Sequence, residues 1–418
     1  MRVTLSAEFE GLADGADAEA ILRKCVHCGF CNATCPTYQL LGDELDGPRG
    51  RIYLIKQVLE GAPVTAKTQT HLDRCLTCRN CETTCPSGVE YGHLVDIGRR
   101  LVDARVPRTA GAKGLRWTRK EGLTSRWFAP AVTLAQALRP LLPRVLRDKI
   151  PSRGETRRSA PAARPHARKV LLLAGCVQPA LRPNINAATI RVLDAAGIET
   201  RIAAAAGCCG AIRHHLNDQS GGLDEMRRNI DAWWPAIAAG DVEAIVVNAS
   251  GCSVTVKEYG HALRRDPAYA AKALRVSGLA RDLSELLPDL VAVLKPRLNN
   301  SGAIRLAYHP PCTLQHGMRL RGGVESQLRE LGFELQPAAS ESHLCCGSAG
   351  TYSVLQPELA RRLRDRKLAA LEALGAPGIV SANIGCIQHL QGGTRTPVRH
   401  WIEVLDSALA ATPVAEPA

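Results

Sequence analysis

The stretch CVHCGFCNATCP, residues 25–36, places four cysteines within eleven residues and ends on a proline. A second stretch, CLTCRNCETTCP at residues 75–86, repeats the spacing C-x2-C-x2-C-x3-C-P. Three cysteines at steps of three residues can hold three corners of one cubane, while the fourth, before the proline, is directed to a neighbouring cluster. The two runs therefore predict two metal sites, each with three ligands from one run and a fourth from the other.

We expect two [4Fe–4S] clusters, each with three ligands from one run and a fourth from the other. The ligands expected for the first cluster are Cys25, Cys28, Cys31 and Cys85. The ligands expected for the second cluster are Cys75, Cys78, Cys81 and Cys35. Zinc is the competing interpretation, but a four-cysteine zinc site typically uses two C-x2-C pairs. Such clusters pass one electron at a time, so electron transfer is expected and no catalytic residue is assigned.

Composition and length place the chain among multidomain proteins of a reducing compartment. It has 418 residues, of which 45% are hydrophobic and sixteen are cysteine. No apolar run reaches about 18 residues, and the N-terminal segment lacks the apolar core of a secretory signal, so we expect a cytoplasmic protein. Because thiols stay reduced there, clustered cysteines favour metal binding or redox chemistry over disulfides.

The net charge of +13 raises the question of an acidic partner. Much of the positive charge lies between Arg139 and Lys169, which predicts a solvated basic linker. An anionic membrane surface is the next interpretation. We expect no nucleic-acid binding, since no nucleic-acid motif accompanies the charge.

The chain divides into four predicted segments. Residues 1–108 form a helical ferredoxin-type domain, in which Pro48 fits a first helical turn. Residues 109–168 begin as an amphipathic stretch and end as a linker rich in proline and arginine. The amphipathic part, about residues 115–147, would suit a membrane interface or a packed helix, and both stay open. Residues 169–300 and 301–418 are two similar α/β halves.

The two α/β halves repeat the same order of strand, helix and cysteine. Apolar strands such as KVLLL and AIVV alternate with helices, which predicts mainly parallel sheets. The first copy holds Cys176, Cys208, Cys209 and Cys252. The second copy holds Cys312, Cys345, Cys346 and Cys386. The gaps are 31 and 42 residues in one copy and 32 and 39 in the other, which indicates duplication.

These second eight cysteines follow predicted strands, whose carboxyl ends share one edge of a parallel sheet. We therefore expect the cysteines of each copy to converge. An additional iron–sulfur cluster or another redox site is one interpretation, and buried structural thiols are the alternative. Each vicinal pair precedes a glycine, which would let the backbone approach a bound group closely.

The two CCG modules resemble the cysteine-rich domain of heterodisulfide reductases, anaerobic glycerol-3-phosphate dehydrogenases and lactate-utilisation proteins. The strings KCVHCGFCNATCPTYQLLGDELDGPRGRIYLIK, NASGCSVTVKEYG and SANIGCIQHLQGGT resemble those of glycolate oxidase iron–sulfur subunits. One departure matters: where the heterodisulfide reductase module ends in C-x-x-C, Thr255 and His389 replace the last cysteine. A five-cysteine cluster therefore cannot be assumed.

The resemblance implies an electron-transfer subunit of a glycolate dehydrogenase complex. A partner subunit containing FAD would oxidise glycolate to glyoxylate, and this chain, inactive alone, would pass electrons towards membrane quinone at the inner face of the cell membrane. Two alternatives stay open. One is the equivalent subunit of a lactate or glycerol-3-phosphate dehydrogenase, and the other is a heterodisulfide reductase-like thiol–disulfide enzyme.

Overall fold

The computed structural model describes residues 1–125, 127–141, 164–298 and 304–411. These residues form two compact units, each described by itself. The first unit comprises residues 1–116, 310–320 and 339–370. The second comprises residues 117–309, 321–338 and 371–418. Two short segments of the second α/β copy thus group with the N-terminal residues, while the predicted domain boundaries remain predictions.

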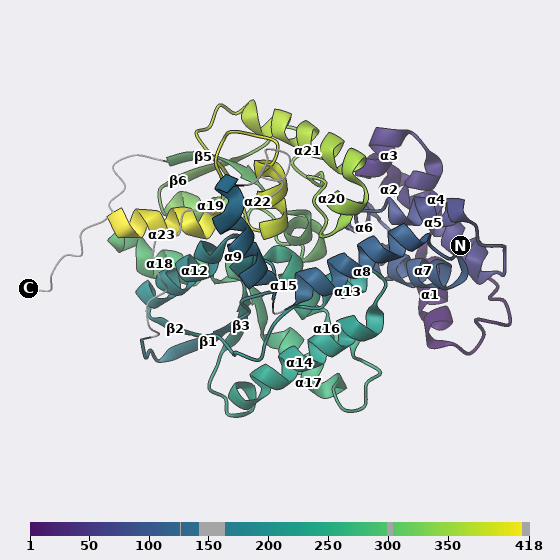
Figure 1. Cartoon of the computed structure of the whole chain (residues 1–418), viewed down its shortest axis with the longest axis horizontal. Coiled ribbons are helices and arrows are strands. Elements are labelled where there is room, and N and C mark those ends of the chain that lie inside the picture. The colour runs from purple at the N-terminus through teal and green to yellow at the C-terminus, as the bar shows by residue number, and fades with distance from the viewer. Residues whose placement is uncertain (126, 142–163, 299–303, 412–418) are drawn as a thin grey trace, which may run out of the picture. The chain divides into compact units, whose positions relative to one another are not determined.

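The N-terminal part of the first unit is helical (Figure 1). Its helices are α1 Ala13–Lys24, α2 Phe30–Ala33, α3 Pro36–Leu41, η1 Glu44–Asp46, α4 Pro48–Leu59, α5 Ala66–Asp73, α6 Asn80–Thr84 and α7 Tyr91–Arg105. Pro48 occupies the first turn of α4, as expected, because its missing N–H is not needed there. The unit also contains η5 Thr313–Gly317 and α20 Tyr352–Leu355. Helices α8 Ala110–Thr124 and α21 Pro357–Glu372 run across the limits of the units in sequence.

An aliphatic core holds α1, α4, α5 and α7 together. Its fully buried members include Leu22, Ile55, Leu59, Leu72, Leu94 and Val95. Helices α4 and α7 pack so closely that a methyl group added at Gly98 would lie 2.5 Å from a side-chain carbon of Ile55. Burial of each large aliphatic side chain contributes about 1.5–3 kcal/mol. This core fixes the loops that carry the two cysteine runs.

The second unit contains two four-stranded parallel sheets, as the sequence predicts. Their strand orders, β2-β1-β3-β4 and β6-β5-β7-β8, are the same in both copies. The strands of the first are β1 Arg168–Leu172, β2 Ile198–Arg201, β3 Ala244–Val247 and β4 Ala280–Asp282. The strands of the second are β5 Ile304–His309, β6 Phe333–Pro337, β7 Ile379–Ser381 and β8 Val398–His400. All four residues of β3 are buried, because helices cover both faces of the sheet.

Helices connect the strands of each sheet. Those of the first copy are α11 Gln178–Leu181, α12 Pro183–Ala195, α13 Ala211–His215, α14 Gln219–Ala238, α15 Ser250–Lys257, α16 Tyr259–Ala262 and α17 Ala270–Leu279. Those after it are η3 Leu283–Leu286, α18 Leu287–Leu294, η4 Lys295–Arg297, α19 Gly323–Glu330, α22 Ile384–Gln391 and α23 Trp401–Ala411. Crossover helices of this kind are what parallel strands require.

The two sheets are joined where β3 and β7 end. The Ser250 backbone N–H donates to the Ala382 carbonyl at 3.1 Å. An ion pair between Arg191 of α12 and Asp406 of α23, with N–O distances of 2.8 and 2.7 Å, ties the helices of the two copies. These contacts join the two sheets within the second unit.

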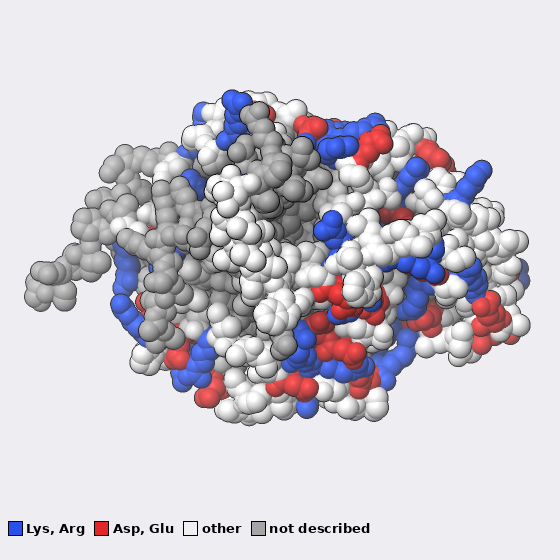
Figure 2. All heavy atoms as spheres, viewed as in Figure 1, with Lys and Arg blue, Asp and Glu red and all other residues white. Residues whose placement is uncertain are grey.

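One stretch of the second unit exposes apolar side chains. Helix α9 (Phe128–Leu138) has no Lys, Arg, Asp or Glu, so its surface is white in Figure 2. Trp127 is 66% exposed, Leu134 61% and, in η2 (Arg139–Leu141), Leu141 81%. Residues 142–163, which include the rest of the predicted amphipathic stretch and linker, lie outside the described residues. Within the described ranges, no helix combines the length and apolar composition that crossing a bilayer needs.

Candidate functional site

The two cysteine runs share an unusual backbone. His27 and Gly29 have φ values of 59° and 86°, and Thr77 and Arg79, at the same places in the second run, have 50° and 59°. Left-handed backbone is rare for residues other than glycine and gathers at functional sites. Each run is therefore wound into the same loop, with its first three cysteines at successive turns.

The first run lines a hollow of the first unit. Its lining includes the four cysteines predicted to act together, Cys25, Cys28, Cys31 and Cys85, which we call site 1. Cys25 is buried and Cys28 exposed. The exposed side chains of Val26 and Phe30 flank Cys28. Site 1 thus has one edge open to the outside of its unit.

The second run lines another hollow of the same unit. Its lining includes Cys35, Cys75, Cys78 and Cys81, which we call site 2. Cys81 also lines the hollow of site 1. Apart from this shared Cys81, each hollow meets three cysteines of one run and the last cysteine of the other, which is the crossed arrangement that the spacing predicts.

The chemistry of the donors suits a cluster. Thiolates are the usual ligands of iron–sulfur clusters, and each expected set takes three cysteines from one run and one from the other. The donor set and the crossed pairing therefore fit [4Fe–4S] clusters.

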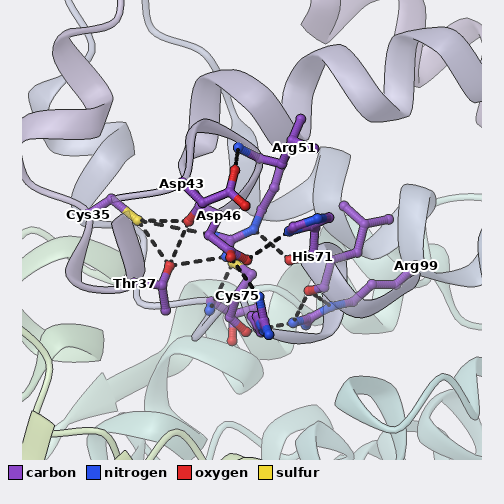
Figure 3. Close-up of polar contacts among 12 residues, drawn as sticks. Cys35, Thr37, Asp43, Asp46, Arg51, His71, Cys75 and Arg99 are labelled. Carbon is purple, nitrogen blue, oxygen red and sulfur yellow. Dashed lines mark hydrogen bonds and ion pairs between the residues drawn. The ribbon is translucent and has the colours of Figure 1, made fainter. Parts of the chain in front are cut away.

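A buried charge network adjoins site 2 (Figure 3). Asp46 is fully buried and accepts from Arg51 at 3.5 Å, Arg74 at 2.8 Å and His71 at 3.1 Å. Burial opposes the charge of Arg51, but the nearby Cys75, Tyr91, Cys35 and Asp46 raise its pKa overall. Arg51 therefore keeps a positive charge beside two of the site 2 cysteines.

Hydrogen bonds from neighbouring side chains reach the site 2 sulfurs. Thr37 lies 3.3 Å from Cys35 Sγ, through its hydroxyl, and Tyr91 donates to Cys75 Sγ at 3.7 Å. Arg99 fixes the loop before the run, since its guanidinium donates to the carbonyls of Leu72 at 2.9 Å and Cys75 at 2.6 Å. Site 2 is thus enclosed by donors and cations, which stabilise negative charge on sulfur.

Burial makes several of these thiols hard to ionise by themselves. Burial, followed by the nearby Cys25, raises the pKa of Cys31 to about 12. Burial also raises the pKa of Cys78 and Cys81 well above the ordinary thiol value. A bound cation is what would favour the thiolate at such positions, since metal binding displaces the proton. The chemistry of the donor set therefore fits a metal-containing group.

The four thiols of the first α/β copy converge, as expected. The thiols act on one another's ionisation: Cys208 raises the pKa of Cys176, and Cys208 and Cys252 raise that of Cys209. Cys176 and Cys209 lower the pKa of Cys208, whose sulfur accepts the Gly210 N–H at 3.4 Å. These cysteines follow β1, β2 and β3, so the shared edge of the sheet gathers them.

The glycine after each vicinal pair has a structural reason. Gly210 and Gly347 have φ values of 93° and 90°. A methyl group at Gly347 would lie 2.6 Å from the Ala360 carbonyl oxygen, and one at Gly210 would lie 2.8 Å from that of Gly222. The close neighbour of each glycine is thus the backbone of a following helix.

In the second copy, Cys312 and Cys345 lie 3.8 Å apart, sulfur to sulfur. Side chains hold the loop before Cys345: the Gln315 amide donates to the Ser342 carbonyl at 3.2 Å, and His316 Nε2 lies 2.9 Å from the His343 carbonyl. Three of its cysteines, Cys312, Cys345 and Cys346, belong to the first unit. The fourth, Cys386, is buried in α22 of the second unit.

Sequence reasoning missed the polar residues that support the thiols. In the first copy, fully buried Asn229 and Tyr259 donate to the Cys208 and Cys209 carbonyls at 2.7 and 2.9 Å. These residues stand inside ordinary amphipathic helices, where a polar residue on the apolar face is the only signal available.

Comparison with known proteins agrees with this arrangement. Residues 21–89 match a family described as a 4Fe-4S dicluster domain, and residues 170–257 and 306–391 match one described as a cysteine-rich domain.

Curated relatives extend the likeness to the whole chain. The chain is similar to the glycolate oxidase iron-sulfur subunit of Escherichia coli, with 56% identity over 98% of this chain and 99% of the relative. It is also similar to a probable glycolate oxidase iron-sulfur subunit of Bacillus subtilis, with 29% identity over 90% of this chain and 89% of the relative. Lactate utilization protein A of Geobacillus thermodenitrificans is 29% identical over 57% of this chain and 98% of its own length.

Proposed function

We propose, from the premise that this chain belongs to the family of glycolate oxidase iron–sulfur subunits, that it binds [4Fe–4S] clusters at sites 1 and 2 and conducts electrons within a glycolate-oxidising complex. The observation that carries the proposal is the crossed set of four cysteines lining each hollow. Each cluster would be ligated by the four cysteines of its site and would accept and release one electron at a time.

The residues around the two sites support different roles for them. At site 2, Arg51 and Arg99 place positive charge and donors near the buried sulfurs, which favours a more negative, reduced state. At site 1, the exposed Cys28 offers a short path between the ligand shell and a docked protein. Site 1 is therefore the site for exchange with a partner, and site 2 the internal one.

The likeness to glycolate oxidase subunits supports a proposal for the partner and the acceptor. A glycolate oxidase subunit implies at least one further subunit, and we propose that it carries FAD and oxidises glycolate to glyoxylate. Two electrons would leave the flavin singly through sites 1 and 2, towards membrane quinone. No residue of this chain is proposed to touch glycolate.

A second candidate substrate rests on the lactate-utilisation relatives, which match 57% of this chain. Lactate is also a 2-hydroxy acid, so the same electron-conducting sites would serve its oxidation. The glycolate assignment is preferred because the relatives named for it match about nine tenths of this chain or more.

The α/β copies supply further candidate ligands. The converging thiols of the first copy, Cys176, Cys208, Cys209 and Cys252, support a third cluster in that half. The cysteines of the second copy support another.

The exposed apolar side chains of α9 and η2 support a peripheral contact with the inner face of the cell membrane. Such a contact would bring the chain to its quinone.

Anaerobic purification tests the central proposal. About eight iron and eight sulfide per chain are expected from sites 1 and 2, with more if the α/β thiols also hold clusters. Replacing Cys28 or Cys78 by serine should each remove one of two low-temperature paramagnetic signals of the reduced protein. Folded protein without iron, or with one zinc per site, would disprove the proposal.

A further inference from the structure

A buried ammonium group lies beside the thiols of the second copy. Lys367 in α21 is only 3% exposed. Its Nζ donates to the carbonyl oxygens of Glu341, at 2.5 Å, and Ser342, at 3.5 Å. In the described part of the chain no carboxylate pairs with Nζ, and the Glu341 carboxylate pairs with Arg366 instead. Carbonyl dipoles thus hold the ammonium in place without neutralising it.

A buried charge without a counter-charge is costly, so a compensating negative group is expected near Lys367. Burial lowers the pKa of Lys367, whereas Cys346, Cys345, Glu341 and Cys312 raise it. Three of these four groups are thiols. Thiolates that hold a metal-containing group would therefore supply the missing negative charge.

The same thiols lie next to site 2. Cys345, Cys312 and Cys78 belong to one packed cluster, together with Leu76 and Leu363. The two loops are also bound together, because His316 Nδ1 lies 2.9 Å from the Thr83 hydroxyl of α6 while Nε2 contacts the loop before Cys345. All these residues belong to the first unit. The second copy thus presents its thiols directly to a predicted site 2 ligand.

The first copy lacks this charge. Lys367 stands 22 residues after Cys345, and Asn229 stands 21 residues after Cys208 in the matching helix α14. Both side chains fix the loop of their vicinal pair, but Asn229 does so with a neutral amide. The positive charge is therefore not needed to hold the loop, and it requires a separate explanation.

We propose that Lys367 is the fixed positive charge of an anionic iron–sulfur centre held by Cys312, Cys345 and Cys346, and that this centre is the electron-transfer neighbour of site 2. The inference rests on the proposed function. One electron would pass from site 2 to the Cys312–Cys345 centre, with no bond broken and no proton transferred. Lys367 is a positioning residue: it touches no reacting atom, and its charge favours the reduced, more negative state of the centre.

Redox titration of the full-length, anaerobically purified chain, followed by electron paramagnetic resonance, tests the inference. In the Lys367→Met variant, the reduction potential of the additional centre should become more negative, and Lys367→Arg should restore most of the shift. The matched control, Lys113→Met, removes an exposed lysine and should move no potential. Iron content and circular dichroism establish that each variant is loaded and folded.

A second measurement does not depend on the fold of the Lys367 variants. In the wild type, the signal of reduced site 2 should be broadened by spin coupling when the additional centre is also reduced, and Cys312→Ser should remove that broadening. The inference would be overturned if the additional centre had the same reduction potential in Lys367→Met as in the wild type. It would also be overturned if reduced site 2 showed no spin coupling to that centre. Either result would leave the proposal for sites 1 and 2 intact. A disulfide between Cys312 and Cys345, with eight iron per chain, would overturn the centre itself. Loss of both ferredoxin-type signals would instead overturn the proposed function.

Discussion

Tyr91 shows how one hydroxyl group can act on one site. It begins α7, it is buried, and its O–H donates to Cys75 Sγ at 3.7 Å. A donor to a ligand sulfur stabilises the reduced cluster more than the oxidised one, because the reduced cluster carries more negative charge. The neighbouring Arg51 acts in the same direction through its charge.

Replacing Tyr91 by phenylalanine should therefore make the reduction potential of site 2 more negative and move that of site 1 less. The loss of one hydrogen bond should lower the free energy of unfolding by about 1 kcal/mol. Redox titration monitored by paramagnetic resonance measures the first effect, and urea denaturation the second. Tyr53→Phe, at an exposed tyrosine of α4, is the control and should change neither quantity. Equal shifts at both sites would contradict this role for Tyr91.

His400 gives a pH-dependent contribution at the end of β8. Burial lowers the pKa of this imidazole to about 3, below its ordinary value of 6.5. Its Nδ1 accepts the Ile402 N–H at 3.1 Å, which the neutral ring allows. Between these two pKa values the unfolded chain binds a proton that the folded chain does not. The stability contribution is therefore full above pH 6.5 and is lost as the pH falls towards 3.

The free energy of unfolding should thus decrease by up to about 1.4 kcal/mol per pH unit below pH 6.5 through His400. In His400→Asn the absolute stability should be lower, but its slope between pH 7 and pH 5 should be smaller. Urea denaturation at a series of pH values measures both quantities. His261→Asn, at an exposed histidine, is the control. A slope unchanged by His400→Asn would refute the assignment.

At the scale of the element, the turn between a vicinal cysteine pair and the helix after it restricts which residue can follow. Gly347 combines a φ of 90° with a close helix carbonyl, whereas Gly350 has a φ of 61° and nothing within 4 Å of an added methyl group. Alanine substitutions at the two glycines therefore distinguish the cost of backbone strain alone from that of strain plus steric overlap.

Gly350→Ala should lower the free energy of unfolding by about 1 kcal/mol, the cost of a left-handed alanine. Gly347→Ala should cost about 3 kcal/mol or more, because α21 must also move. The same change should disturb the Cys312–Cys345 pair and reduce any iron above eight per chain. Denaturation and iron analysis measure these effects. Similar costs for the two variants would show that the contact of Gly347 with α21 does not matter.

The exposed apolar side chains next to α9 make a separate prediction about lipid. Trp127 and Leu134 should insert into the interface of anionic vesicles. The double variant Trp127→Ser and Leu134→Ser should weaken co-sedimentation with such vesicles about tenfold or more, since two large apolar groups contribute a few kcal/mol. Leu274→Ser, at a 70% exposed leucine of α17, is the control. Equal binding by both variants would argue against α9 as the lipid contact.

At the scale of the whole molecule, the sequence predicts the features that depend on cysteine spacing and strand order. It does not predict which distant segments pack together. The cysteine spacings predict the crossed lining of sites 1 and 2, and the strand–cysteine order predicts the convergence of the first copy. These follow from short-range geometry. The sequence could not show that residues 310–320 and 339–370 group with the N-terminal residues, because contacts such as that of Thr83 with His316 span 233 positions and leave no periodicity. For the same reason, the sequence alone does not indicate that Lys367 is buried.

The division of labour between subunits makes the last prediction. Mixed anaerobically with glycolate alone, the oxidised chain should keep its visible cluster absorbance, because neither site offers a group that takes hydride from a 2-hydroxy acid. The absorbance should decrease only after the flavin-containing partner is added, and faster with glycolate than with lactate or glycerol 3-phosphate. A Cys78→Ser variant should lose part of the decrease, since site 2 is removed while site 1 remains. Bleaching by glycolate without a partner would place substrate oxidation in this chain, and faster bleaching with lactate would reassign the complex to that acid.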